Sequence, residues 1–191
     1  MGRYTTVLID NNQISDIIKV LRSGYTYKGV NHRSNYQIAT IMLLQANLGC
    51  RIGDIVHLEV EDIIFDGEAY RLDMIEQKTG KLRRYVVATP VKAVIDDWCR
   101  MKCITKGRLF TIEEHAVWKQ LRAVTGYLNM QNVSAHSFRK SAAMRVYNDS
   151  GKDIALTCQY LNHSSPAVTM AYLKRSTKQM DELCSQSAIM V

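Results

Sequence analysis

One turn between two segments that read as strands distinguishes this chain from a simple helical bundle. Lys-Thr-Gly-Lys at 78–81 separates AYRLDMI at 69–75 from LRRYVVAT at 82–89. AYRLDMI partly alternates, LRRYVVAT reads as the returning strand, and two strands that flank a glycine turn are typical of an antiparallel β-hairpin. Elsewhere the apolar residues recur at helical spacing, as they do in the group Ile14, Ile17, Ile18 and Leu21. The sequence therefore predicts a mainly α fold with one small antiparallel sheet, which belongs to the α+β class.

Capping residues and prolines divide the rest of the chain into helices. A helix is expected over 33–48 with Gly49 as its cap, and a short one in CRIGDIVHLEVEDI after it. The other predicted helices cover 90–101, the segment after the capping box TIEE at 111–114, a segment that Ser134 or His136 opens and that ends before Gly151, the segment from Asp153, and a last short helix from Pro166. No linker separates these segments, so one domain over 1–191 is expected.

The charge of the chain is positive and uneven. The net charge is +7, and residues 71–108 hold ten Lys or Arg against four Asp or Glu. Residues 136–178 hold seven Lys or Arg against two acidic residues. Two basic regions suit a phosphate backbone better than a small acidic substrate.

Several classes of protein do not fit this sequence. MGRYTTVLIDNN contains no apolar segment of a signal peptide, and the longest apolar run, IATIMLL, stops at Gln45, so no membrane span is expected. Cys99 and Cys103 lie one helical turn apart, but no second pair follows to complete a metal site. We therefore expect a cytoplasmic protein with reduced thiols, no metal and no cofactor.

Six polar residues are the candidates for a catalytic site. Singly, each has an ordinary explanation, such as a solvated turn lysine, a capping histidine or a core tyrosine. In order, they read as an arginine, a hairpin lysine, His-x-x-Arg and His-x8-Tyr, which together fit phosphoryl transfer. The six are Arg51, Lys78, His136, Arg139, His163 and Tyr172.

The roles of these residues follow from the charge that builds up at a phosphodiester during in-line displacement. Arg51 and Arg139 can hold the equatorial oxygens with paired hydrogen bonds, and no carboxylate cluster offers a Mg²⁺ site. Tyr172 is the predicted nucleophile, and its unperturbed pKa of about 10 calls for a base. That base is His136, or else His136 orients a phosphate oxygen.

The two remaining residues complete the scheme. Lys78 at the hairpin tip can protonate the departing sugar 5′-oxygen, and His163 can donate to a non-bridging oxygen. Tyr147 and Tyr160 are expected in the core, so Tyr172 is preferred over them.

The motifs resemble those of the tyrosine recombinases, also called phage integrases, over about 8–173. NLGCRIGDIVHLEVEDI resembles the first arginine box, with Asp54 at the position of a supporting acid. EQKTGKLRRYVV resembles the hairpin that carries the catalytic lysine, and the resemblance selects Lys78 over Lys81. HSFRKSAAMRVY is similar to the His-x-x-Arg box, and LNHSSPAVTMAYL to the Leu-Gly-His box with its nucleophilic tyrosine.

The resemblance implies a site-specific DNA recombinase, such as those of mobile genetic elements. It would cleave and rejoin double-stranded DNA through a 3′-phosphotyrosyl intermediate without metal, in integration, excision or inversion. It would act as a homotetramer on two DNA sites and could be a monomer in free solution. The residues expected to contact DNA are Lys81, Arg83, Arg84, Lys140, Lys174 and Arg175.

The chain departs from the family pattern at three points. Asn162 stands where glycine is usual, and Lys140 where histidine is common. No N-terminal core-binding domain precedes Leu8, so we expect weak DNA binding and either a fragment or a short recombinase such as a fimbrial-switch invertase. Residues 174–191 are expected to dock on a neighbouring protomer or to form a frayed end.

Three other functions compete with recombination. A type IB topoisomerase uses the same residue types but relaxes supercoiled DNA without a partner site. A DNA-binding regulator could have the fold without the activity, and a metal nuclease would lose cleavage in a chelator.

Overall fold

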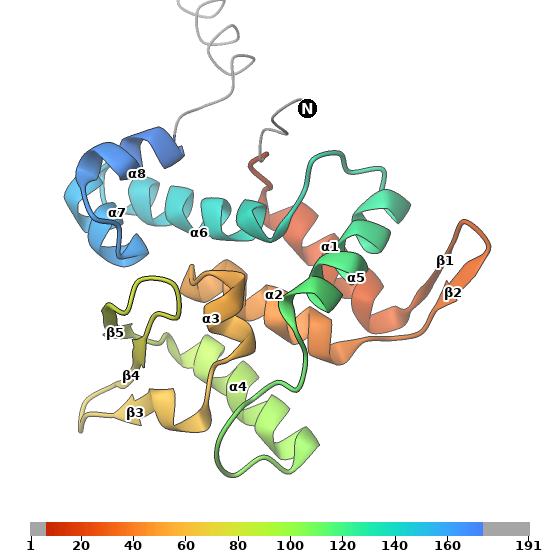
Figure 1. Ribbon diagram of the computed structural model, residues 1–191, viewed down its shortest axis with the longest axis horizontal. Helices are drawn as coiled ribbons and strands as arrows, with labels where there is room; N and C mark the ends of the chain where they lie inside the picture. Colours follow the sequence, from red (N-terminus) through yellow and green to blue (C-terminus); the bar gives the residue numbers. More distant parts are fainter. Residues whose placement is uncertain (1–6, 174–191) are drawn as a thin grey trace, which may run out of the picture.

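The computed structural model of the chain describes residues 7–173, which form eight α-helices and two small antiparallel sheets that lie at opposite edges of the helices (Figure 1). The helices are α1 (Asn11–Ser23), α2 (Tyr36–Leu48), α3 (Ile52–Val56), α4 (Thr89–Lys102), α5 (Glu114–Tyr127), α6 (Ala135–Asp149), α7 (Ile154–Leu161) and α8 (Pro166–Leu173). The strands are β1 (Tyr25–Tyr27), β2 (Val30–His32), β3 (Ile63–Phe65), β4 (Tyr70–Ile75) and β5 (Leu82–Val86), with a 3₁₀ turn, η1, over Val60–Asp62. The predicted α+β class is confirmed.

Helix α2 is the centre of the fold. Its residues from Ile38 to Leu48 are buried except Leu43 and Asn47, as expected of a helix that is apolar on all sides. Helices α1 and α6 pack along it, and α3 and α4 contact it as well. The predicted stripe of α1 faces this core, since Ile14, Ile17, Ile18 and Leu21 are all buried.

The predicted hairpin forms the larger sheet, which has the strand order β3-β4-β5. Its register pairs Ile75 with Leu82 beside the turn, and Arg71 with Val86 at the other end. The expectation of a single sheet is wrong, because β1 and β2 form a second, two-stranded one. Lys28 and Gly29 link these strands with φ of 49° and 75°, the left-handed pair that a tight hairpin turn requires.

Most helix boundaries agree with the predictions. Gly49 caps α2 at φ 60°, Ser134 caps α6 with Ser137 in a capping box, and Asp153 caps α7. The predicted capping box at Thr111 is wrong, because α5 begins only at Glu114. The chain before α5 is held against α4 instead, since Trp98 Nε1 donates to the Leu109 carbonyl at 2.8 Å.

The last three helices form a smaller unit at one end of the molecule. Ala143, Leu161 and Leu173 make a hydrophobic cluster of their own beside the main core. Helix α8 packs on α6 and α7 (Figure 1). Over 7–173, no helix is long and apolar enough to cross a membrane.

Candidate active site

Arg51 stands at the N-terminus of α3 and is held by a buried carboxylate. Its Nη1 donates to Glu76 Oε2 at 2.6 Å, and the Glu76 side chain has no exposed surface. Glu76 follows β4, where the chain turns toward β5, and it also accepts from Thr79 Oγ1 at 2.7 Å and from Arg83 Nη1 at 2.8 Å. Burial alone would raise the pKa of Glu76, but these hydrogen bonds from Thr79, Arg51 and Arg83 outweigh it and lower the pKa.

Arg83 is buried and does not lie on the surface where it was expected to contact DNA. The residue is 2 % exposed, and its guanidinium is paired with Glu76 and donates to the carbonyl oxygens of Leu48, Gly49 and Tyr160. Alternation along β5 turns this side chain inward, while its neighbours face solvent. Arg83 is therefore part of the scaffold that holds Arg51.

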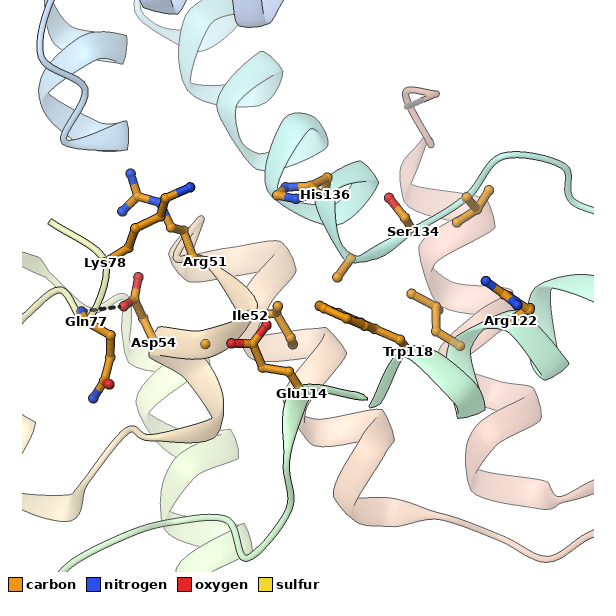
Figure 2. A pocket seen from close by; sticks show the side chains of 14 residues that line it. Arg51, Ile52, Asp54, Gln77, Lys78, Glu114, Trp118, Arg122, Ser134 and His136 are labelled. Atoms are coloured by element: carbon orange, nitrogen blue, oxygen red, sulfur yellow. Dashed lines mark hydrogen bonds between the residues drawn. The ribbon is translucent and has the colours of Figure 1, made fainter. Parts of the chain in front are cut away.

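The turn that carries Lys78 is fixed to α3 by Asp54. Asp54 is 1 % exposed, and its Oδ1 accepts from the backbone N–H of Gln77 at 2.9 Å, as Figure 2 shows. Lys78, Arg51 and His136 line one end of a cavity of about 650 Å³ (Figure 2). Trp118 of α5 also lines this cavity.

Arg139 is buried at the junction of three helices. It is 2 % exposed; its Nη1 donates to the Gly49 carbonyl at 2.8 Å and its Nη2 to the Leu161 carbonyl at 2.9 Å. These bonds join α6 to the ends of α2 and α7. The Nη2 atom also lies 3.5 Å from Nε2 of His163.

His163 follows the end of α7, where Asn162 replaces the glycine of the family pattern. Asn162 adopts φ 55° and ψ 38°, a left-handed conformation that asparagine tolerates, and its Nδ2 donates to the Leu82 carbonyl of β5 at 3.2 Å. The substitution therefore preserves the turn. His163 Nδ1 lies 3.1 Å from the hydroxyl of Thr169 in α8.

Tyr172 of α8 is half-buried beside this histidine. The two rings are 5.4 Å apart at 83°, and the phenol donates to the backbone oxygen of His136 at 3.4 Å. Burial raises the pKa of Tyr172, whereas the charge of Arg139, its hydrogen bond to the phenol and the charge of Arg51 lower it.

Both histidines are neutral near pH 7. Partial burial and the charges of Arg139 and Lys78 lower the pKa of His136. Burial and the charges of Arg139 and Arg51 lower the pKa of His163 to about 4. A neutral imidazole can accept a proton, which a charged one cannot.

The six predicted residues thus come from five separate segments and meet on one face of the domain. Direct contacts link Arg139, His163 and Tyr172, and the cavity brings Arg51, Lys78 and His136 together. Two supporting residues, Glu76 and Thr169, were missed. Glu76 lies within the hairpin motif, but no local pattern indicates that a carboxylate there is buried.

The other predicted DNA contacts differ in position. Lys81 and Arg84 are exposed on the hairpin, and Arg84 pairs with Asp73 of β4. Lys140 is half-buried on α6. Lys174 and Arg175, with the rest of the tail 174–191, lie outside the described residues. Within 7–173 no group of three metal-ligating side chains occurs.

Comparisons with known proteins agree on one family. The model of the phage integrase family matches residues 8–179. A probable integrase/recombinase of Bacillus subtilis, YoeC, is 27% identical over 142 residues, which cover 70% of this chain and 75% of YoeC.

Solved structures have the same fold at lower identity. The crystal structure of XerA recombinase superposes with a TM-score of 0.70 at 17% identity, covering 100% of this chain and 67% of that one. A lambda integrase dimer bound to a COC′ core site gives a TM-score of 0.70 at 16% identity, with coverage of 91% and 49%.

Proposed function

This chain belongs to the phage integrase family, and we propose that it cleaves and rejoins double-stranded DNA as a tyrosine-type site-specific recombinase. The observation that carries the proposal is the meeting of Tyr172, Arg139 and His163 beside the cavity that holds Arg51, Lys78 and His136. DNA as the partner is supported by the lambda integrase structure, which contains a core-site DNA.

The two arginines are the proposed binding groups for the scissile phosphate. A guanidinium has five N–H donors. Glu76 takes one from Arg51. Arg139 gives two to carbonyls and directs others at His163 Nε2 and the Tyr172 phenol, two groups that a bound phosphate would also meet. The remaining donors suit the non-bridging oxygens, where charge accumulates in the transition state. Arg139 is well oriented for this because its own position is fixed by buried bonds.

Strand cleavage then proceeds by transfer of two protons and exchange of one P–O bond. The oxygen of Tyr172 attacks phosphorus, its proton passes to the imidazole of His136, and the bond to the 5′-oxygen breaks. Lys78 protonates that 5′-oxygen, and His163 donates to a non-bridging oxygen. The product is a 3′-phosphotyrosyl linkage, which a DNA hydroxyl can attack to reverse the step.

In the free protein the phenol donates to the backbone oxygen of His136 and not to its ring. Proton transfer therefore requires the side chain of His136 or Tyr172 to rotate when DNA binds. We propose a homotetramer on two sites as the assembly that exchanges strands, with integration, excision or inversion as its result.

A covalent trap tests the nucleophile. The full chain is incubated in EDTA with a pool of nicked duplexes of randomised sequence, followed by denaturing electrophoresis. We expect an adduct that forms without metal and disappears in Tyr172→Phe. Tyr147→Phe, a tyrosine of α6 that packs on the small cluster, is the matched control and should retain the adduct.

Each other outcome points to a different conclusion. An adduct that persists in Tyr172→Phe would identify another nucleophile, and cleavage lost in EDTA would indicate a metal nuclease. Specific DNA binding without any adduct would support a silent regulator. Relaxation of supercoiled plasmid without a second site would support a topoisomerase.

A second experiment tests Lys78 as the general acid. Lys78→Ala should slow cleavage of ordinary DNA by about 10²-fold or more. A substrate with sulfur at the 5′-bridging position needs no protonation to leave, so it should restore most of the rate. Lys81→Ala on the same turn is the control and should cleave both substrates at similar rates. An equally slow reaction of Lys78→Ala with the sulfur substrate would exclude this role.

A further inference from the structure

We propose that Thr169 is a positioning residue whose hydroxyl determines which ring nitrogen of His163 carries the proton, so that the imidazole can donate to the scissile phosphate. The inference rests on the proposed function, in which His163 contacts a phosphate oxygen. Its structural basis is the 3.1 Å approach of Thr169 Oγ1 to His163 Nδ1, at a side chain with 0% exposure. Water is therefore kept from this contact.

Helix α8 presents Thr169 and Tyr172 to the same neighbour. The two residues are one helical turn apart, so they share a face, and both lie against the ring of His163. Thr169 lies in the first turn of this helix, where its backbone N–H donates to the Ser165 carbonyl at 3.3 Å. The element that carries the nucleophile thus also supplies the hydrogen bond that holds the histidine.

The arrangement in the free protein selects one tautomer of His163. Nε2 faces Arg139 Nη2 at 3.5 Å, and a guanidinium can only donate. Nε2 is therefore the accepting nitrogen, and the ring proton lies on Nδ1, where it donates to Thr169 Oγ1. A pKa of about 4 keeps the ring neutral near pH 7, so it carries a single N–H.

Binding of a phosphate requires the opposite tautomer. A phosphate oxygen accepts hydrogen bonds, so Nε2 must carry the proton in order to donate to it. Nδ1 then becomes an acceptor and needs a donor in the same place. The hydroxyl of Thr169 meets both needs because it can rotate from accepting to donating. A backbone carbonyl at this point would permit only the first state.

Nitrogen NMR tests the switch without any cleavage. In the ¹⁵N-labelled full chain, with His163 assigned through His163→Gln, we expect the Nδ1–H tautomer in the free state. Saturating inorganic phosphate should move the population toward Nε2–H. In Thr169→Val, which has nearly the same shape without a hydroxyl, the change on adding phosphate should be largely lost. A full tautomer shift in Thr169→Val would overturn the inference, as would no shift in the wild type.

Cleavage kinetics provide the second test. Thr169→Ser keeps the hydroxyl and should cleave within about threefold of the wild type, whereas Thr169→Val should lose about 10–100-fold in rate with little change in DNA affinity. This loss is smaller than the roughly 10²–10³-fold cost of deleting a donor to a developing oxyanion, since His163 remains. Equal defects in the Ser and Val variants would mean that the hydroxyl is not the operative group.

A double-mutant cycle separates this role from general damage to α8. In a His163→Gln background, Thr169→Val should cause no further loss of rate, because the group through which it acts is gone. An additive loss would contradict the inference. Absence of any covalent adduct in the wild type would refute the proposed function but would leave the NMR result standing.

Discussion

At the scale of single residues, Glu76 supports the site through several buried hydrogen bonds, although no pattern in the sequence indicates this role. It is a carboxylate without exposed surface that accepts hydrogen bonds from Arg51, Arg83 and Thr79. Removing one partner of a buried ion pair leaves an uncompensated charge, which costs much more than the pair gains. Glu76 therefore contributes both to the stability of the domain and to the position of Arg51, a residue proposed to bind the scissile phosphate.

Replacement of Glu76 measures this connection. Glu76→Gln should lower the free energy of unfolding by about 3–5 kcal/mol, because Arg83 stays buried without its counter-charge. Asp73→Asn, which breaks the exposed pair with Arg84 on the same sheet, is the control and should cost less than about 1 kcal/mol. Urea denaturation at neutral pH compares the two, and equal losses would refute the special role of Glu76.

The pH dependence of the same variant has a defined sign. The folded state lowers the pKa of Glu76, so the carboxylate stabilises the fold above its unfolded pKa of about 4.3. That contribution is lost as the pH falls through the lower, folded value. The stability difference between wild type and Glu76→Gln should therefore be constant near neutrality and shrink below about pH 4. A difference that grows on acidification would contradict the assignment.

At the scale of elements, the site is assembled from the ends of helices and not from their middles. Arg51 begins α3, Gly49 and Asn162 terminate α2 and α7, and the carbonyls at those ends hold Arg139. Helix termini carry unpaired backbone groups, and here a buried guanidinium satisfies them. A change at a terminus should therefore move the arginine as well as the helix.

Gly49 is the terminus where this can be tested. A Cβ at Gly49 would lie 2.5 Å from the Tyr160 hydroxyl oxygen, and its φ of 60° disfavours any side chain. Gly49→Ala should thus destabilise the fold by more than the roughly 1–2 kcal/mol of left-handed strain alone. Gly151→Ala, at φ 69° with open space around it, isolates that strain. Thermal unfolding of the two variants measures the difference. Equal shifts of the unfolding temperature would show that the clash with Tyr160 is relieved.

The sequence was informative where a motif and a periodic pattern coincided. The stripe of α1, the Gly49 cap and the hairpin around Lys78 were predicted correctly, because each depends on residues close in sequence. The order of the six site residues suggested that they converge, and the family resemblance gave them their roles. The expected α+β class follows from the same local signals.

The features that were missed depend on distant contacts. Arg83 was expected on the DNA surface, yet it is buried because Glu76 and three carbonyls from other elements surround it. Thr111 looked like a helix cap, but packing of the preceding segment against α4 decided where α5 begins. The Lys28-Gly29 turn was a local signal that could have revealed β1 and β2.

At the scale of the whole molecule, charge on the hairpin is expected to set the salt dependence of DNA binding. Lys81 is exposed at the end of the turn that carries Lys78, and each phosphate contact contributes about 0.9 to the slope of log K against log salt. Lys81→Ala should reduce this slope by about one. Lys106→Ala, an exposed lysine in the connection between α4 and α5, is the control and should leave it unchanged. Binding to one duplex at several salt concentrations supplies both slopes.

The division of the hydrophobic core into a main and a smaller cluster affects the order in which parts of the site become fixed. The charged cavity rests on the main core through α2 and α3, whereas α8 is anchored by Ala143, Leu161 and Leu173 at the edge. Amide hydrogens of α8 should therefore exchange with solvent well before those of α2. We therefore expect the residues of the cavity to bind a phosphodiester before α8 has brought the oxygen of Tyr172 into line for attack. Phosphate binding and nucleophilic attack would then be separate steps within one small domain.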